Sequence, residues 1–110
     1  MSRPPHLSVI IPLLNEADSL SQLYRELQEA LRPWADSYEL IFVDDGSTDA
    51  SFAVLEKLHT EDPRVIVLRF RRNQGKASAL TTGFRQARGE ILVTLDADLQ
   101  DDPREIPRFL

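Results

Sequence analysis

The feature that most constrains the fold of this chain is an alternation of short apolar runs with stretches of helical periodicity. The apolar runs cover residues 7–11, 39–43, 65–68 and 91–95, and all are rich in Val, Ile and Leu. Runs of this length and composition predict strands. The second run, 39–43, is nearly all apolar, as expected for a strand that is covered on both faces. Four strands separated by three helices predict a parallel, right-handed α/β sheet in a single domain, residues 1–110.

Apolar residues recur at helical spacing in all three segments between the predicted strands. We expect Pro12 to end the first strand, and Asp18 or Ser19 to cap the helix that follows it. The second helix is expected to end at Asp62-Pro63 and the third at Gly89. The apolar positions that carry this pattern are Leu20, Leu23, Leu27, Phe52, Leu55, Leu58, Leu80 and Phe84.

Composition excludes several classes of protein. The chain has no cysteine, which excludes disulfides, thiolate zinc sites, iron–sulfur clusters and cysteine nucleophiles. No apolar run is long enough to cross a bilayer and no signal-peptide pattern is present, so the cytoplasm is the expected location. Gly75-Lys76 is not part of a P-loop, because Phe70 stands where that motif requires glycine.

Charge is unevenly distributed along the chain. The net charge is −5, yet residues 64–88 contain seven basic residues and no acidic one, whereas the rest contains six basic and eighteen acidic residues. The acidic total argues against nucleic acid as a partner. The basic segment indicates either a phosphate-bearing ligand or arginines that solvate a strand end and a helix face, and charge alone favours solvation.

Polar clusters follow all four predicted strands at their carboxyl ends. They are Asn15-Glu16, Asp44-Asp45, Arg71-Arg72-Asn73 and Asp96-Ala97-Asp98. In parallel α/β sheets, ligands bind outside the carboxyl ends of the strands. The position of these clusters on one edge is the strongest physical indication of function in the sequence.

The acidic clusters each allow two interpretations. Asp96 and Asp98, with Gln100 as a further oxygen donor, have the spacing to bind Mg²⁺ or Mn²⁺ together with substrate phosphates. Alternatively, they form a solvated turn that caps a helix beginning near Pro103, and the two interpretations are about equally favoured. Asn15-Glu16 also has the composition of a helix-capping device.

The Asp44-Asp45 cluster is equally ambiguous. A carboxylate at the end of a strand can accept hydrogen bonds from a ribose or a nucleobase. The same residues also suit an Asx turn in which Gly46 has positive φ and Ser47 or Thr48 caps the next helix. Both interpretations hold if the two aspartates have different roles.

Four segments in order, 9–16, 42–49, 73–90 and 96–103, make up a pattern that covers nearly the whole chain. Together they resemble family 2 glycosyltransferases. The string Asp-Ala-Asp-Leu-Gln-Asp-Asp-Pro at 96–103, followed by Ile106-Pro107, is most similar to the branch of dolichol-phosphate mannosyltransferases and bactoprenol glucosyltransferases.

The resemblance implies a GT-A (Rossmann-like) nucleotide-diphospho-sugar transferase fold, with a mostly parallel sheet, flanking helices and a truncated length. It implies inverting transfer of a sugar from a UDP- or GDP-linked donor to a polyprenyl phosphate, with Mg²⁺ or Mn²⁺ as cofactor. The positions that it assigns to the nucleotide sugar are Pro12, Leu14, Glu16, Val43, Asp45, Asp96, Ala97 and Asp98. Those that it assigns to the metal are Asp96, Asp98 and Gln100.

Other properties stay open at this point. Leu14 stands where the branch often has an aromatic residue, which leaves the donor base undefined, and no catalytic base or oligomeric state is indicated. The length suits the amino-terminal, donor-binding half of a longer enzyme, whose remaining segments would supply the acceptor side and any membrane-surface association. The rival interpretations are a non-catalytic nucleotide-sugar-binding fragment and a receiver-type signalling module.

Overall fold

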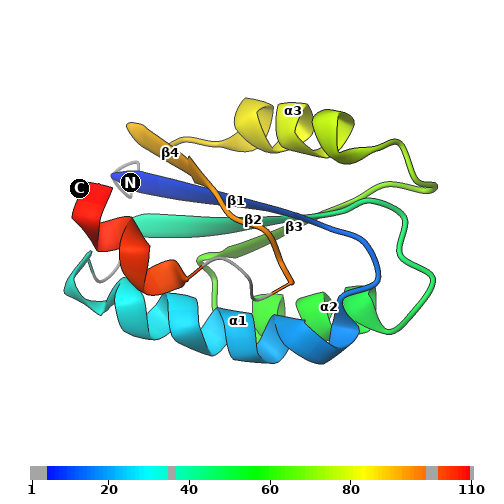
Figure 1. Cartoon of the computed structure of the whole chain (residues 1–110), viewed down its shortest axis with the longest axis horizontal. Helices are drawn as coiled ribbons and strands as arrows, with labels where there is room; N and C mark the ends of the chain where they lie inside the picture. Colours follow the sequence, from blue (N-terminus) through cyan, green and yellow to red (C-terminus); the bar gives the residue numbers. More distant parts are fainter. Residues whose placement is uncertain (1–4, 35–36, 99–101, 110) are drawn as a thin grey trace.

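Four parallel strands form one sheet with helices on both faces (Figure 1). The computed structural model describes residues 5–34, 37–98 and 102–109. The strands are β1 (Leu7–Leu13), β2 (Tyr38–Asp44), β3 (Val65–Arg69) and β4 (Ile91–Thr94). The helices are α1 (Ala17–Ala30), α2 (Ser51–Glu61) and α3 (Lys76–Gln86), with 3₁₀ turns η1 (Arg32–Trp34) and η2 (Pro103–Phe109). The predicted α/β class is confirmed.

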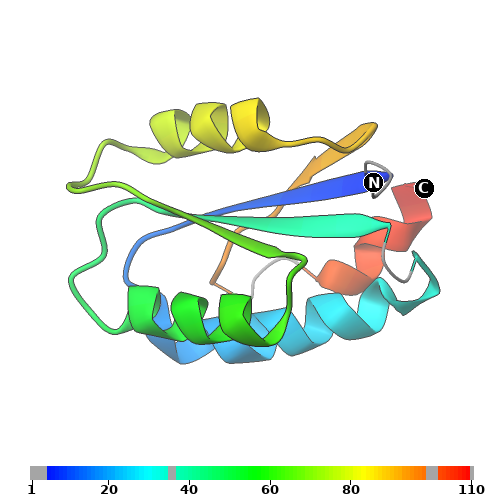
Figure 2. The same ribbon diagram turned by 180° about the vertical axis from the view of Figure 1, so that it is seen from behind.

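The strand order β3-β2-β1-β4 defines where a ligand can enter the sheet. The chain first runs outward from β1 to β2 and β3, with α1 and α2 on one face (Figures 1 and 2). Helix α3 then crosses the opposite face and brings the chain to β4, on the other side of β1. The strand order therefore reverses between β1 and β4, and crevices at such reversals bind ligands in open α/β sheets.

Strand β1 continues past Pro12 and ends at Leu13, so the expectation that Pro12 ends it was wrong. The carbonyl of Ile10 accepts the N–H of Leu95, on the β4 side, and that of Leu13 accepts the N–H of Asp45, on the β2 side. By alternation, the nitrogen of Pro12 faces the β4 side, where pairing has already stopped at Ile10 and Thr94. The missing N–H of proline therefore costs no ladder hydrogen bond.

Two apolar clusters, one on each face, hold the helices against the sheet. The larger cluster packs α1, α2 and η2 onto one face, and includes Leu20, Leu23, Leu27, Phe42, Leu55, Leu58, Leu95 and Ile106. The smaller cluster lies beneath α3 and consists of Ile10, Ile41, Val43 and Ala79, with partly buried neighbours. Strands β1 and β2 are buried on both faces. The outer strands are less covered: β3 is partly buried, and β4 has Leu92 and Thr94 exposed.

The observed helix starts differ from those expected. Helix α1 begins at Ala17, one residue before Asp18, and α2 begins at Ser51, beyond Ser47 and Thr48. Neither helix has a side-chain cap from its own N-cap residue. The amides at both starts donate instead to Asp49, whose Oδ1 accepts from Ser51 and whose Oδ2 accepts from Ala17. One aspartate in the loop before α2 thus serves both helices, and its hydrogen bonds from Ser51 lower its pKa.

A buried glutamate, which the apolar pattern of β2 does not predict, stabilises the amino-terminal end of the sheet. Glu39 is 2% exposed and accepts hydrogen bonds from the Ser8 hydroxyl (2.6 Å) and the Arg88 amide (2.8 Å). The Gly89 amide donates to Ser8 in turn. A Cβ at Gly89 would lie within 2.8 Å of the backbone of Leu7 and Ser8. Gly89 is therefore required by this close approach; helix α3 has already ended at Gln86.

A second polar cluster joins α1, α2 and β3. Asp62 is 4% exposed and accepts hydrogen bonds from the Tyr24 hydroxyl (2.7 Å) and from the backbone and guanidinium of Arg64 (2.9 Å). Burial raises the pKa of Asp62, but the hydrogen bonds from Arg64 and Tyr24 outweigh it and leave that pKa below its ordinary value. Burial and the bond to Asp62 raise the pKa of Tyr24 to about 12.

We expect Asp62→Asn to lower the free energy of unfolding near neutral pH by about 2 kcal/mol, because charge-assisted hydrogen bonds are lost. In the wild type this stabilisation is present above the unfolded-state pKa of about 3.9, and it is lost as the pH falls through the lower folded-state pKa. The difference between the two proteins should therefore shrink as the pH falls below about 3.9. Urea unfolding at several pH values measures it, with exposed Glu56→Gln as the control. A difference independent of pH would contradict this role.

Candidate functional site

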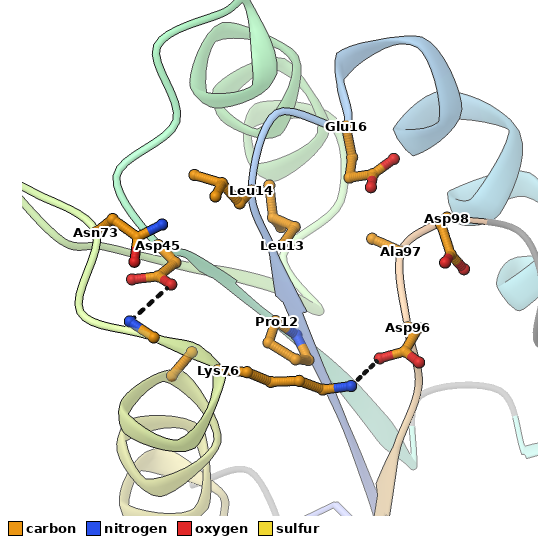
Figure 3. Close-up of a pocket in the computed structure, with 12 residues that line it drawn as sticks. Pro12, Leu13, Leu14, Glu16, Asp45, Asn73, Lys76, Asp96, Ala97 and Asp98 are labelled. Atoms are coloured by element: carbon orange, nitrogen blue, oxygen red, sulfur yellow. Dashed lines mark hydrogen bonds and ion pairs between the residues drawn. The ribbon is translucent and has the colours of Figure 1, made fainter.

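A pocket of ≈390 Å³ opens where β1 and β4 diverge at their carboxyl ends. Figure 3 shows its walls, which come from the ends of β1, β2 and β4 and from the start of α3. The residues that line it are Pro12, Leu13, Leu14, Glu16, Asp45, Asn73, Gly75, Lys76, Ala79, Asp96, Ala97 and Asp98. The pocket thus occupies the crevice that the strand order defines.

Seven of the eight residues that the sequence assigned to a nucleotide sugar line this one pocket. The exception is Val43, whose side chain is fully buried in the apolar cluster beneath α3. Gln100, assigned to the metal, lies outside the described residues. The pocket contains five residues that the assignment did not include: Leu13, Asn73, Gly75, Lys76 and Ala79.

Asp44 and Asp45 have different roles in the structure. The sequence left room for this division of roles between the two aspartates. Asp44 is fully buried, and its Oδ1 accepts the amide N–H of Ser47 at 2.8 Å, which is an Asx turn. Gly46 has φ 83°, as expected for that turn. A Cβ at Gly46 would lie 2.6 Å from the backbone of Arg72 and Asn73. The turn after β2 and the loop after β3 are therefore in direct backbone contact.

Asp45 binds the loop that precedes α3. Its Oδ1 accepts the amide N–H of Gln74 at 2.7 Å and its Oδ2 accepts that of Gly75 at 3.0 Å. Asp45 is 5% exposed, so both contacts are well protected from water. Because Gly75 is the N-cap of α3, this carboxylate fixes the position of the first residue of the helix, Lys76. The sequence did not predict this structural role.

The segment after β1 is fixed by the loop after β2. Asn15 has φ 54°, and its Oδ1 accepts the amide N–H groups of Thr48 (2.8 Å) and Asp49 (3.2 Å). The amide of Asn15 donates to the Ser47 hydroxyl and that of Glu16 to the Ser51 hydroxyl. Asn15 therefore bridges two loops and does not cap α1. The bridge holds Leu14 and Glu16 at the mouth of the pocket (Figure 3).

Lys76 and Asp96 connect the two walls of the crevice. The Lys76 ammonium donates to Asp96 Oδ1 at 2.7 Å, across the pocket beneath Pro12 (Figure 3). Both side chains are substantially exposed, at 63% and 46%. The sequence offered one signal for Lys76, which is its place in the basic segment of residues 64–88. Gly75-Lys76 does not belong to a P-loop motif. The contact itself depends on the tertiary fold.

The donor set of the pocket fits a divalent cation that shares its coordination with a ligand. Asp96 and Asp98 both line the pocket, but the described residues contain no group of three or more acidic or histidine side chains arranged to hold a metal. Mg²⁺ is commonly bound by one or two carboxylates together with water and substrate phosphates. Two aspartates at a pocket large enough for a phosphate therefore suit such an ion.

Comparison with known proteins agrees with this geometry. The model of the family described as glycosyl transferase family 2 matches residues 8–110. The chain belongs to this family. Undecaprenyl-phosphate 4-deoxy-4-formamido-L-arabinose transferase of Proteus mirabilis is 47% identical over 105 residues, covering 94% of this chain and 32% of that protein. The Pseudomonas fluorescens SBW25 protein of the same name is 45% identical and covers 94% and 31%.

Solved structures identify the fold as GT-A. The mannosyltransferase PcManGT from Pyrobaculum calidifontis, in complex with GDP-Man and Mn²⁺, matches with a TM-score of 0.80 and 31% identity over 94% of this chain and 30% of its own. TarS 1-349 of S. aureus in complex with UDP matches with a TM-score of 0.67 and 28% identity over 84% and 27%. This chain spans about a third of the length of its curated relatives.

The receiver-type alternative is excluded by topology as well as by family. Doubly wound folds of the receiver type place β1 between β2 and β3. Here β1 lies between β2 and β4.

We expect Asp45→Asn to release the loop before α3. An amide group can accept only one of the two backbone hydrogen bonds, and its NH₂ would face the other donor. The free energy of unfolding should fall by about 1–2 kcal/mol, and the amides of Gln74 and Gly75 should exchange with solvent faster. Hydrogen-exchange NMR and urea unfolding measure both effects, with Glu56→Gln on α2 as the charge-matched control. Unchanged exchange at Gln74 and Gly75 would contradict the clamp.

Proposed function

We propose that the protein binds a nucleotide-diphosphate sugar in the pocket between β1 and β4, as the donor side of a polyprenyl-phosphate glycosyltransferase. The observation that carries the proposal is the convergence of seven predicted donor-site residues on one crevice of a family 2 chain. The names of the curated relatives support undecaprenyl phosphate as the class of acceptor. GDP-Man and UDP in the matched structures support the class of donor.

The arrangement of the walls suggests how the donor lies. Leu14, which is 39% exposed, and Pro12 offer apolar surface near Asp45, an environment suited to a nucleobase and ribose. Asp96 and Asp98 follow β4, and the Lys76 ammonium reaches Asp96 from the start of α3; these three groups suit the diphosphate and sugar. Aliphatic contact through Leu14 gives no stacking partner, so base selectivity would depend on hydrogen bonds at the rim.

The proposed reaction is a single displacement with inversion. A phosphate oxygen of the acceptor forms a bond to the anomeric carbon of the sugar while the bond from that carbon to the nucleoside diphosphate breaks. The leaving diphosphate takes the bonding electron pair. A phosphate is already anionic near neutral pH, so it needs less help from a general base than a sugar hydroxyl does. The task of the donor site is to hold the diphosphate and stabilise the charge it gains.

Asp96 and Asp98 are the residues that would hold a divalent cation, and Gln100 is a further candidate outside the described residues. When bound, Mg²⁺ or Mn²⁺ would neutralise charge on the diphosphate. No helix in the described part of the chain has the length and apolar character needed to cross a bilayer. We propose a cytoplasmic location, at the membrane surface where a polyprenyl phosphate is available.

We expect Mn²⁺ to bind weakly on its own and more tightly when UDP or GDP is present, because two carboxylates leave most of an octahedral shell to other ligands. Asp98→Ala should remove this dependence of metal affinity on nucleotide. Asp98 is exposed, so the variant should fold normally. Calorimetric titrations with and without nucleotide test this, with Asp18→Ala as a control on the exposed first turn of α1. Equal affinities in wild type and Asp98→Ala would exclude Asp98 from the site.

We also expect residues 1–110 to bind the donor without transferring the sugar efficiently. The chain spans about a third of the length of its curated relatives, and positioning of an acceptor and exclusion of water supply much of the rate in such displacements. Incubation with Mn²⁺, a labelled nucleotide sugar and a short polyprenyl phosphate, followed by glycolipid extraction, measures transfer. Rapid turnover would contradict the assignment of these residues to the donor side alone.

A further inference from the structure

Lys76 has a position in the pocket that the donor-site assignment does not use. Among the described residues that line the pocket, four are carboxylates and Lys76 is the single cation. The carboxylates are Glu16, Asp45, Asp96 and Asp98. A nucleoside diphosphate is itself a polyanion, so this lining would repel it unless positive charge is directed at its phosphates.

The fold places Lys76 within reach of two alternative partners. Its backbone is held at the start of α3, because Asp45 binds the amides of Gln74 and Gly75 immediately before it. Its side chain has a flexible four-carbon stem and extends over the pocket floor to Asp96 (Figure 3). The ammonium can therefore swing without any movement of the helix, and any anion bound between β1 and β4 would lie within its range.

The contact with Asp96 is suited to exchange. Both side chains are substantially exposed, 63% for Lys76 and 46% for Asp96, and ion pairs of this kind contribute little to stability. At Asp96 the ammonium compensates charge among the clustered carboxylates. It does so at one of the two aspartates that suit a divalent cation, so ammonium and metal compete for Asp96.

We propose that Lys76 exchanges Asp96 for the diphosphate of the donor when metal and nucleotide bind together. This inference rests on the proposed function and adds to it a residue that contacts the leaving group. With Asp96 and Asp98 holding a divalent cation, the Lys76 ammonium would leave Asp96 and donate to the diphosphate oxygens. It then stabilises the negative charge that the leaving group gains as the bond to the sugar breaks. The exchange couples nucleotide affinity to metal affinity through one side chain.

Lys76→Met tests the exchange because it should change two affinities in opposite directions. Without nucleotide, Mn²⁺ alone should bind several times more tightly than to the wild type, since Asp96 has lost its competing ammonium. In the presence of saturating Mn²⁺, the affinity for UDP or GDP should fall by about tenfold or more, because the variant loses one charge-assisted hydrogen bond to the nucleotide. Electron paramagnetic resonance of free Mn²⁺ measures the first quantity and calorimetry the second.

Two further variants complete the test. Lys57→Met removes the other lysine of the chain, which is exposed on α2 away from the pocket, and should change neither affinity. Lys76→Arg keeps the positive charge and should retain most of the nucleotide affinity. A fall in both affinities in Lys76→Met would indicate a structural role, and no change in either would remove Lys76 from the site; both results overturn the inference. If the wild-type protein itself binds neither UDP nor GDP with Mn²⁺, the proposed function fails with it.

Discussion

The missing N–H of Pro12 is the constraint on which the open crevice depends. Strand β1 continues to pair with β2 as far as Leu13 and Asp44, but its pairing with β4 stops at Ile10 and Thr94. At Pro12 the backbone has no donor to offer on the β4 side, so a longer β4 would leave one of its own carbonyls unpaired there. The chain after β4 is therefore free to diverge, and Asp96, Ala97 and Asp98 line the space that results.

Hydrogen bonds from backbone amides to three side chains hold the walls of this space in place; Asp44 and Asp45 are buried and Asn15 is exposed. Asp45 binds the loop before α3, Asp44 binds its own turn, and Asn15 bridges the segments after β1 and β2. Each contact satisfies amides that would otherwise need water in a crowded rim. The pocket lining carries negative charge, because Glu16, Asp45, Asp96 and Asp98 all belong to it. The only compensating cation among the described lining residues is Lys76, whose partner choice then becomes a means of controlling the site.

Two buried carboxylates that stabilise the fold lie outside the pocket, whereas Asp45 both stabilises the fold and lines the pocket. The Asp62 cluster and the Glu39 cluster lie away from the pocket, and both are buried and satisfied by several hydrogen bonds. The pocket carboxylates Asp96 and Asp98 are at the other extreme, half-exposed or exposed at the carboxyl ends of the strands. Buried carboxylates with full hydrogen bonding stabilise a fold, whereas exposed ones remain available to a ligand.

The local pattern of the sequence determined the element types, the parallel sheet and the edge where polar residues gather. The reason is that burial on both faces leaves a strand with a nearly continuous apolar run, and the polar residues that follow it must lie at the end of the sheet. The resemblance of its motifs determined the family and seven residues of the pocket.

Tertiary structure alone decided how β1 passes through Pro12, where the helices start and how Lys76 enters the pocket, because these features depend on neighbours distant in the chain. The position of Pro12 inside β1, just beyond the last residue that pairs with β4, is apparent only in the assembled sheet. The starts of α1 and α2 depend on Asp49, which accepts hydrogen bonds from both. The position of Lys76 in the pocket depends on two contacts: Asp45 binds the loop before it, and Asp96 accepts a hydrogen bond from its ammonium.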